Sequence, residues 1–462
     1  MDKVRRVSNT ASRADRAAAL LIFAGALLTV SLHWPGHMSV DTLLQLRDGL
    51  SRDYRSNQPP AMSWLVALMQ RSPLGLGGLL ALNVGVWSAC AWRLYRLLAE
   101  RGGWRPWAAL LVWFLFPVSF FYNGILWKDV LAAHLAALAF LLVIPGRGSS
   151  PHGGALIAGA LAIAAAALLR QQMVVVIPIL AAAIGMVSRA RGRWNALGRT
   201  GLWFGGVLAL TQLAGAALKH GATDFSEPSI QGPIYQLITF DLAGIQHHGG
   251  QLRTPALTAA GMQDTERLAA MLALYGPDRV DRLGEFSDNP IIGVMHRRDW
   301  TSLLAADWWA SIRANPGAYA AHRWEHFLWQ AGFRDTLACL PFYFGISPLP
   351  ADFPMLPLPP GNPTRDARLT ALGHGLMPLF RPAIYATIAL LALIGLGYRR
   401  PRYWEVLAGL QVAGLAYLGS YLLIGIACDF RYAYFLVPVA LIGTFSLWLP
   451  RRAHPLSGVA PT

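Results

Sequence analysis

Long apolar runs separated by short polar turns make up most of the chain. Ten of these runs approach or exceed the length that a helix needs to cross about 30 Å of hydrocarbon. They occupy residues 17–33, 75–98, 106–122, 130–145, 153–169, 172–188, 200–218, 382–397, 403–427 and 433–450. This pattern predicts an all-α polytopic membrane protein with about ten transmembrane helices. The shorter apolar run 59–70 predicts a re-entrant or interfacial helix.

One long polar stretch interrupts this series. Residues 219–381 are richer in Pro, Asp, His and Gly than the rest, and we expect mostly short helices there. The predicted organisation is a transmembrane region 1–218 with a first polar loop at 34–74, then the polar segment 219–381, then C-terminal transmembrane helices in 382–462. The polar segment is therefore inserted before the last three helices.

The composition is typical of a membrane protein, and the distribution of charge argues against a nucleic-acid-binding protein. Of 462 residues, 55% are hydrophobic and only 14% are charged, against about 25% charged in soluble proteins. The net charge of +15 is spread over short clusters between apolar runs, without a basic stripe beside stacking aromatic residues, which argues against nucleic-acid binding. No small-residue cleavage site follows the first run, so we expect a retained helix, not a signal peptide.

The positive charges also predict an orientation. The densest clusters lie at the N-terminus and within 93–105, 189–199, 399–402 and 451–452, and the positive-inside rule assigns them to the cytoplasm. The first loop, the turns near residues 128, 170 and 431, and the segment 219–381 then face the periplasmic side of a bacterial inner membrane.

The first outward loop holds the leading candidate for chemistry. A helix beginning at Val40 places Asp41, Gln45, Asp48 and Arg52 on one face by their spacing. We expect this face to point to water while the opposite, apolar face lies in the membrane surface. Asp41 is the candidate reactive carboxylate, and Asp48 is more typical of a solvated neighbour.

Three other outward turns each place a cation at the membrane edge. These cations are Lys128, beside Asp129; Arg170; and Arg431, two residues after Asp429. Ionisable residues at such positions are costly and are usually functional or paired. The adjacent opposite charges allow simple ion pairs, and Arg170 allows an interfacial anchor. Three cations on one side nevertheless favour an anion site, with phosphate as the natural ligand.

Histidines and cysteines do not define a metal site. His322 and His326 have the i, i+4 spacing of two ligands on a helix, but no third ligand is fixed by spacing. The three cysteines, Cys90, Cys339 and Cys428, have neither metal-ligand nor disulfide-framework spacing. A bond between Cys339 and Cys428 requires an oxidising space and stays open. No cofactor is predicted, and a divalent metal has no support.

With these features in place, the chain resembles the GT-C superfamily of polytopic glycosyltransferases, which includes protein O-mannosyltransferases and lipid A aminoarabinose transferases. The resemblance rests on the order and sidedness of Ser39-Val-Asp41, Asn57-Gln-Pro-Pro60, Trp127-Lys-Asp129, Asn315-Pro-Gly-Ala-Tyr-Ala-Ala-His-Arg323 and Asp429-Phe-Arg-Tyr432. It covers residues 17 to about 450. The absence of a phosphate-cradling Gly motif or a nucleotide-binding βαβ pattern argues against a sugar-nucleotide donor.

The resemblance implies inverting sugar transfer, on the outer face, from a polyprenyl-phosphate carrier to a glycan, lipid or protein acceptor. Asp41 corresponds to the general base, and Lys128, Arg170 and Arg431 to the cations that bind the donor phosphate. The Asp-Glu pair of the mannosyltransferases is absent because Thr42 follows Asp41. The candidate second acids are Asp48 and Asp129. The candidate sugar or acceptor contacts are His37, Gln58, Trp127, His322, Arg323 and Tyr432.

Two other functions use similar cations. A flippase or transporter for an anionic envelope lipid binds phosphate without covalent chemistry. Transporters more often show inverted repeats and helices broken at the midplane, whereas here the polar residues lie at one edge. A glycan polymerase or ligase takes its glycan from a diphosphate lipid, and we expect its base to come from the long polar segment, for example His322.

Overall fold

The structure is a computed structural model that describes residues 2–54, 59–145, 153–187, 193–220, 227–255, 272–284, 300–348, 356 and 358–451. Every regular element in these ranges is a helix, and only isolated β-bridges join neighbouring segments. The predicted all-α fold class is confirmed at this level.

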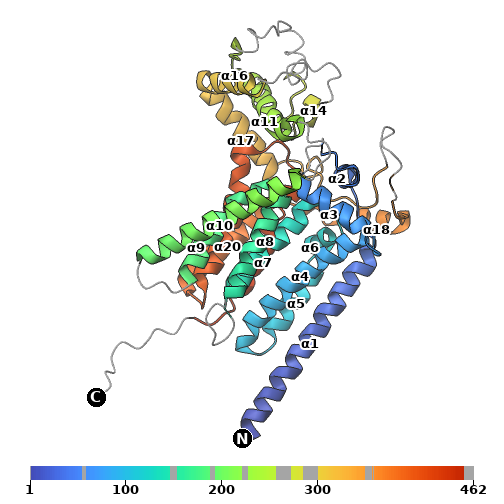
Figure 1. The fold of residues 1–462 in the computed structure, drawn as a ribbon, viewed down its shortest axis with the longest axis vertical. Coiled ribbons are helices and arrows are strands. Elements are labelled where there is room, and N and C mark those ends of the chain that lie inside the picture. Colours follow the sequence, from blue (N-terminus) through green and yellow to red (C-terminus); the bar gives the residue numbers. More distant parts are fainter. Residues whose placement is uncertain are drawn as a thin grey trace.

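The long helices form one bundle, in which most run along the long axis of the molecule (Figure 1). Each of the ten predicted apolar runs contains a helix of this bundle. These helices are α1 (Asp2–His33), α4 (Gly77–Leu98), α5 (Arg105–Leu115), α7 (Lys128–Val143), α8 (Gly153–Leu169), α9 (Ile177–Val187), α10 (Arg193–His220), α19 (Pro382–Arg399), α20 (Trp404–Ile424) and α22 (Leu436–Ser446).

Fewer helices than ten are long and apolar enough to cross a membrane. Among the described residues there are four, Arg13–His33, Ala196–Leu218, Pro382–Arg399 and Trp404–Ile424, or five if the bent pair α5 and α6 (Pro117–Asn123) forms one span. The bend of 55° falls at Phe116, whose extended backbone suits the residue before a proline. Proline thus divides the predicted run 106–122.

Two further apolar runs contain α-helices that are shorter than the runs themselves. The run 172–188 begins with the 3-10 turn η2 (Gln171–Val175) before α9. In the last run, 433–450, α22 covers Leu436–Ser446, and the short helix α21 (Phe430–Ala433) ends at the first residue of the run. Both runs thus begin with a non-α or short helical segment close to Arg170 and Arg431.

Large apolar side chains cover the outside of the bundle. Leu20 and Phe23 on α1, Leu202 and Leu213 on α10, and Leu391 on α19 are each more than half exposed. So many exposed large apolar side chains on long apolar helices are typical of a surface that contacts lipid. Together with the spans and the composition, they indicate a membrane protein.

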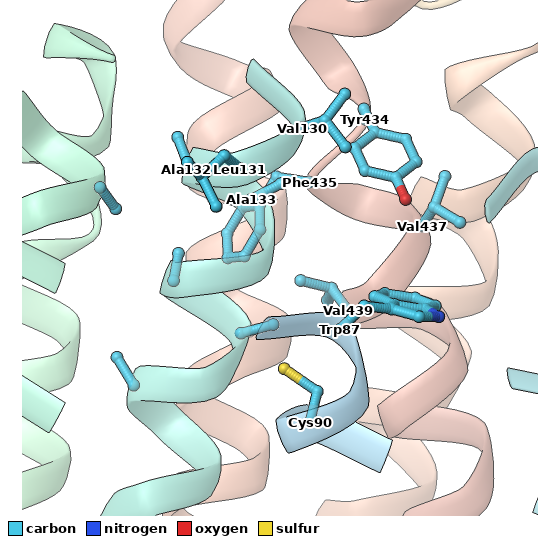
Figure 2. Packing of buried hydrophobic residues seen from close by; sticks show 14 of the residues in the cluster. Trp87, Cys90, Val130, Leu131, Ala132, Ala133, Tyr434, Phe435, Val437 and Val439 are labelled. Carbon is cyan, nitrogen blue, oxygen red and sulfur yellow. The ribbon is translucent and has the colours of Figure 1, made fainter. Parts of the chain in front are cut away.

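The interior of the bundle is aromatic and tightly packed. Trp87 on α4 stacks on Trp113 of α5 with ring centroids 3.9 Å apart. Figure 2 shows Trp87 and Cys90 of α4, Val130 of α7, and Tyr434 and Val439 of the last segment within one buried cluster. His134 of α7 shares a hydrogen bond of 3.0 Å with the Tyr434 hydroxyl. These contacts join α4, α7 and the segment that leads into α22.

A smaller group of helices lies beyond the end of the bundle that is opposite both termini (Figure 1). It contains α11 (Glu227–His247), α14 (Asp281–Gly284), α16 (Trp300–Ala314) and α17 (Pro316–Gln330). We call residues 227–348 the outer segment. It has an apolar core of its own, with Phe240, Leu242 and Leu304 fully buried. After it, α18 (Pro363–Gly375) and η3 (Met377–Leu379) lead into α19.

The first loop corrects one prediction. It forms α2 (Val40–Ser51) and α3 (Pro60–Gln70), but the middle of the polar face of α2 does not point to water. Gln45 and Asp48 are buried, whereas Arg52 is exposed and Val40 is 45% exposed. The reason is α3, which packs so closely that a Cβ atom on Gly49 would lie 2.0 Å from the Ser63 carbonyl oxygen. Helical spacing identified the face correctly and its environment wrongly.

Candidate functional site

A cavity of about 620 Å³ lies where the bundle meets the outer segment. Its lining combines residues from α2, α7, η2, α11, α20 and the segment that precedes α22. The charged residues of this lining are Asp41, Lys128, Arg170, Arg279, Asp281, Asp429 and Arg431. Its polar residues include Gln171, Gln172, Gln236, Tyr421 and Tyr432. The cavity thus collects the predicted carboxylate and all three predicted cations.

Backbone contacts explain why Asp41 and Lys128 meet. The backbone N–H of His37 donates to the Gly124 carbonyl at 2.9 Å, and that of Leu126 donates back to the His37 carbonyl at 2.9 Å. The Trp127 indole N–H then donates to the Ser39 hydroxyl at 2.8 Å. These bonds hold the start of α2 beside the start of α7. Lys128 is the first residue of α7, and Asp41 is the second residue of α2.

Arg431 lies at the centre of the charged lining. Its guanidinium donates to the Asp41 carboxylate and, at 3.0 Å, to Asp429. It also lies over the rings of Trp127, at 4.9 Å from the centroid, and Tyr432, at 5.0 Å. Two carboxylates and two aromatic faces therefore fix the direction of one guanidinium, which is the arrangement that suits planar recognition of an oxyanion.

Arg170 has its own set of partners on the other side of Tyr432. Its guanidinium lies 2.9 Å from the Asp129 carboxylate and donates to the Gln172 side-chain oxygen at 2.7 Å. It donates to the Tyr421 hydroxyl at 3.0 Å and lies 4.4 Å from the centroid of the Tyr432 ring. Asp129 is almost fully buried and is absent from the cavity lining. In this structure it is the ion-pair partner of Arg170.

Asp429 joins the bundle to the outer segment. One oxygen accepts from Arg431, and the other lies 3.4 Å from Arg279. Burial raises the pKa of this carboxyl group, while the neighbouring Arg431 and Arg279 act in the opposite direction. The carboxylate can stay ionised in its buried place because two guanidinium groups surround it.

The backbone before Asp429 is fastened to the outer segment at several points. Val280 N–H donates to the Ile426 carbonyl at 2.8 Å, and Cys428 N–H donates to the Asp278 carbonyl at 2.9 Å. Cys428 also forms a disulfide bond with Cys339, 89 residues earlier in the chain. The bond that the sequence left open is therefore formed, directly beside the cavity.

A second polar cluster, within the outer segment, contains two of the candidate contact residues. Buried Asp241 accepts from His322 at 3.0 Å and lies 2.5 Å from Arg323. The other ring nitrogen of His322 shares a 2.9 Å hydrogen bond with Tyr275. Burial lowers the pKa of His322, while the bond to Asp241 raises it. The histidine is engaged on both sides and does not line the cavity.

Arg323 contacts the backbone of the cavity wall but does not line the cavity. It donates to the Gly425 carbonyl at 2.7 Å. A Cβ atom on Gly425 would lie 2.5 Å from the His326 ring, so only glycine fits there without movement. Gly425 begins the segment whose next residues, Ile426 and Ala427, line the cavity. Arg323 therefore supports the wall of the cavity from outside it.

Three of the remaining candidates, His37, Asp48 and Trp127, lie apart from the cavity lining. His37 is buried, bonds to His33 at 2.9 Å and accepts from the Gly345 N–H at 3.0 Å, and burial lowers its pKa to about 2. Asp48 pairs with Arg47 at 3.0 Å at the contact between α2 and α3. Trp127 lies beneath Arg431. Gln58 lies outside the described residues.

Several lining residues had no signal in the sequence. Arg279 and Asp281 belong to the polar stretch 219–381, where neither apolar periodicity nor membrane sidedness separates them from many similar residues. Tyr421 lies within an apolar run that reads as a plain span. Among the described residues, no group of three His, Cys, Asp or Glu side chains could hold a metal ion. The lining thus offers cations, carboxylates and amides for binding.

Comparison of the chain with protein-family models, with curated proteins and with solved structures finds no match.

Proposed function

We propose that the chain is a membrane glycosyltransferase that moves a sugar from a polyprenyl-phosphate carrier to a cell-envelope acceptor. The observation that carries this proposal is the cavity itself. It gathers Asp41 with Lys128, Arg170 and Arg431, from four distant parts of the chain, at one end of an apolar bundle. A base beside an anion site is what transfer from a phosphate carrier needs.

The cations of the cavity bind the donor phosphate. Two of these cations pair with carboxylates in the structure, since Arg431 holds Asp41 and Asp429 and Arg170 holds Asp129. A phosphate offers the same kind of bidentate acceptor as these carboxylates. When it binds Arg431, it takes over the bond to Asp41. Donor binding then frees the Asp41 carboxylate at the moment when a base is required.

The reaction is a single displacement at the sugar. The acceptor hydroxyl oxygen attacks the anomeric carbon while the bond from that carbon to the phosphate oxygen breaks. The hydroxyl proton passes to Asp41, and the electron pair of the broken bond stays on polyprenyl phosphate. Lys128, Arg170 and Arg431 stabilise the charge that develops there, so the leaving group requires no proton. The configuration at the anomeric carbon inverts.

Apolar residues on one side of the cavity suit the prenyl chain. Val174 and Val175 at the end of η2 and Ile424 at the end of α20 line the cavity. Val174 and Ile424 are both more than one-third exposed. They continue the apolar surface of the bundle up to the charged lining. A carrier lipid that moves sideways from the bilayer would meet this side first.

The proposed topology has ten membrane segments, a cytoplasmic N-terminus and a periplasmic cavity. The positive charge clusters support this orientation. The Cys339–Cys428 disulfide, beside the cavity, supports it independently, because such bonds persist in oxidising compartments such as the bacterial periplasm.

Binding of a short carrier tests the anion site. We expect farnesyl phosphate to bind the detergent-purified protein, measured by isothermal titration calorimetry. Lys128→Ala and Arg431→Ala should each weaken binding about tenfold or more, since a bond to a charged group contributes about 1.5–3 kcal/mol. Arg96→Gln is the control, because Arg96 pairs with Asp15 away from the cavity. Unchanged affinity in both cavity variants would remove the basis of the proposal.

A further inference from the structure

Four charged residues form a continuous chain from the outer segment to the proposed base. Arg279 lies 3.4 Å from one oxygen of Asp429, and Arg431 lies 3.0 Å from the other oxygen. Arg431 also donates to Asp41. Positive and negative groups alternate along this chain, and all four residues line the cavity. Every link is an ion pair, so a change at one end alters the balance at the other.

We infer that Arg279 and Asp429 are positioning residues that set how strongly Arg431 holds Asp41. The inference rests on the proposed role of Asp41. Asp429 competes with Asp41 for the same guanidinium, and Arg279 limits that competition by drawing on the second oxygen of Asp429. Neither residue takes part in the bond changes of the transfer. They determine how readily Asp41 gives up Arg431.

The backbone makes this chain rigid. Arg279 forms a β-bridge with Ala427, and the neighbouring bonds from Val280 to Ile426 and from Cys428 to Asp278 hold the two segments in register. The carboxylate of Asp429 is only 3% exposed. Charges held in fixed places and shielded from water interact more strongly than exposed pairs. Through Asp429 and Arg431, the outer segment thereby acts indirectly on Asp41 of α2.

Other charged groups near Asp41 also affect its protonation. Lys128 at the start of α7 acts on Asp41 as a second cation. The further titratable or charged groups of this network are Tyr432 on the segment of Arg431, Asp129 and Arg170 in the bundle, and Asp278 and Asp281 beside Arg279. These groups are unchanged in the variants proposed below. Any shift between the variants therefore comes from Asp429 and Arg279.

Substitution of Asp429 and substitution of Arg279 should shift the pH at which Asp41 is protonated in opposite directions. Asp429→Asn removes a competitor and a like charge, so Asp41 stays ionised to lower pH. Arg279→Gln removes a positive charge and releases Asp429 to hold Arg431 more strongly, so Asp41 takes up its proton at higher pH. A role limited to structural support gives no reason for opposite signs. We expect shifts of about one pH unit downward for Asp429→Asn and about half a unit upward for Arg279→Gln.

The pH dependence of carbodiimide labelling measures this without any substrate. Dicyclohexylcarbodiimide modifies protonated carboxyl groups, and mass spectrometry of the peptide containing Asp41 gives the midpoint of labelling against pH. Arg313→Gln is the matched control. Arg313, near the end of α16 in the same outer segment, is exposed, lies over the Trp309 ring at 5.7 Å and is absent from the cavity lining. Its variant should keep the wild-type midpoint.

Shifts of opposite sign support the inference, and shifts of the same sign, or none, overturn it. If Asp429→Asn does not fold, the comparison of Arg279→Gln with Arg313→Gln decides alone. An upward shift confined to Arg279→Gln supports the inference, and equal midpoints overturn it. Labelling does not depend on sugar transfer. Its failure is therefore distinct from failure of the proposed function, which is decided by the transfer activity of an Asp41 variant.

Discussion

Cys339 and Cys428 form a disulfide bond that attaches the loop after α17 to the residue directly before Asp429. The Phe430 N–H also donates to the Cys339 carbonyl at 3.0 Å. The segment that carries Asp429 and Arg431 is thus held by a covalent and a hydrogen bond to the outer segment. The geometry of the cavity depends on this attachment.

Loss of the disulfide should therefore weaken both folding and anion binding. A bond that closes a long loop stabilises a protein by about 2–5 kcal/mol. The Cys339→Ser/Cys428→Ser variant should unfold at a lower temperature and bind farnesyl phosphate more weakly. Thermal unfolding and calorimetry in the same detergent measure both effects.

The free cysteine provides the control for that experiment. Cys90 is fully buried on α4, away from the cavity lining. Cys90→Ala should keep the farnesyl phosphate affinity of the wild type, and a reducing agent should act on wild type as the double substitution does. Full affinity in the protein without the disulfide would show that the cavity does not depend on this bond.

The ion pair between Arg170 and Asp129 predicts a stability effect. Both side chains are largely buried, and removal of one partner of such a pair costs about 3–5 kcal/mol because the other charge stays without compensation. Asp129→Asn should therefore lower the unfolding temperature strongly. The Asp129→Asn/Arg170→Gln double variant should recover part of that loss. Thermal unfolding of the three proteins tests this.

The exposed pair of Asp15 and Arg96 is the matched control for this prediction. Its side chains are 35% and 53% exposed, and such pairs contribute less than about 1 kcal/mol. Asp15→Asn should hardly change the unfolding temperature. If Asp129→Asn is as stable as wild type but has lost transfer, Asp129 is the second acid that the sequence offered and not a partner of Arg170.

The sequence predicted the fold better than it predicted the environment of single residues. Apolar length placed a helix in each predicted run, but only four helices of the described residues, or five with the bent pair, are long and apolar enough to cross a membrane. It did not show the break at Pro117 as a bend, or the short helices at the turns of Arg170 and Arg431. On α2, spacing placed Asp48 on the face of Asp41. Only the packing of α3 reveals that this face is buried.

For the candidate site too, the sequence predicted the location of residues better than their contacts. Membrane sidedness placed Asp41, Lys128, Arg170 and Arg431 at one edge, and the structure brings these four into one cavity. Their roles stay predictions. The contribution of Arg279 had no sequence signal, because it depends on pairing of the outer segment with residues 426–428. The disulfide likewise depends on a contact across 89 residues, which cysteine spacing does not encode.

The central claim is that Asp41 is the base of a transfer reaction. Its most direct test is the incorporation of labelled sugar into the envelope fraction of cells that carry Asp41→Asn as the sole copy. The substitution keeps the size of the side chain and removes its basicity, so transfer should fall about a hundredfold or more. Farnesyl phosphate should still bind, and lipid-linked sugar should accumulate on the outer face. Transfer at the wild-type rate by folded Asp41→Asn protein would contradict the claim, and loss of lipid-linked sugar from the outer face would favour a flippase instead.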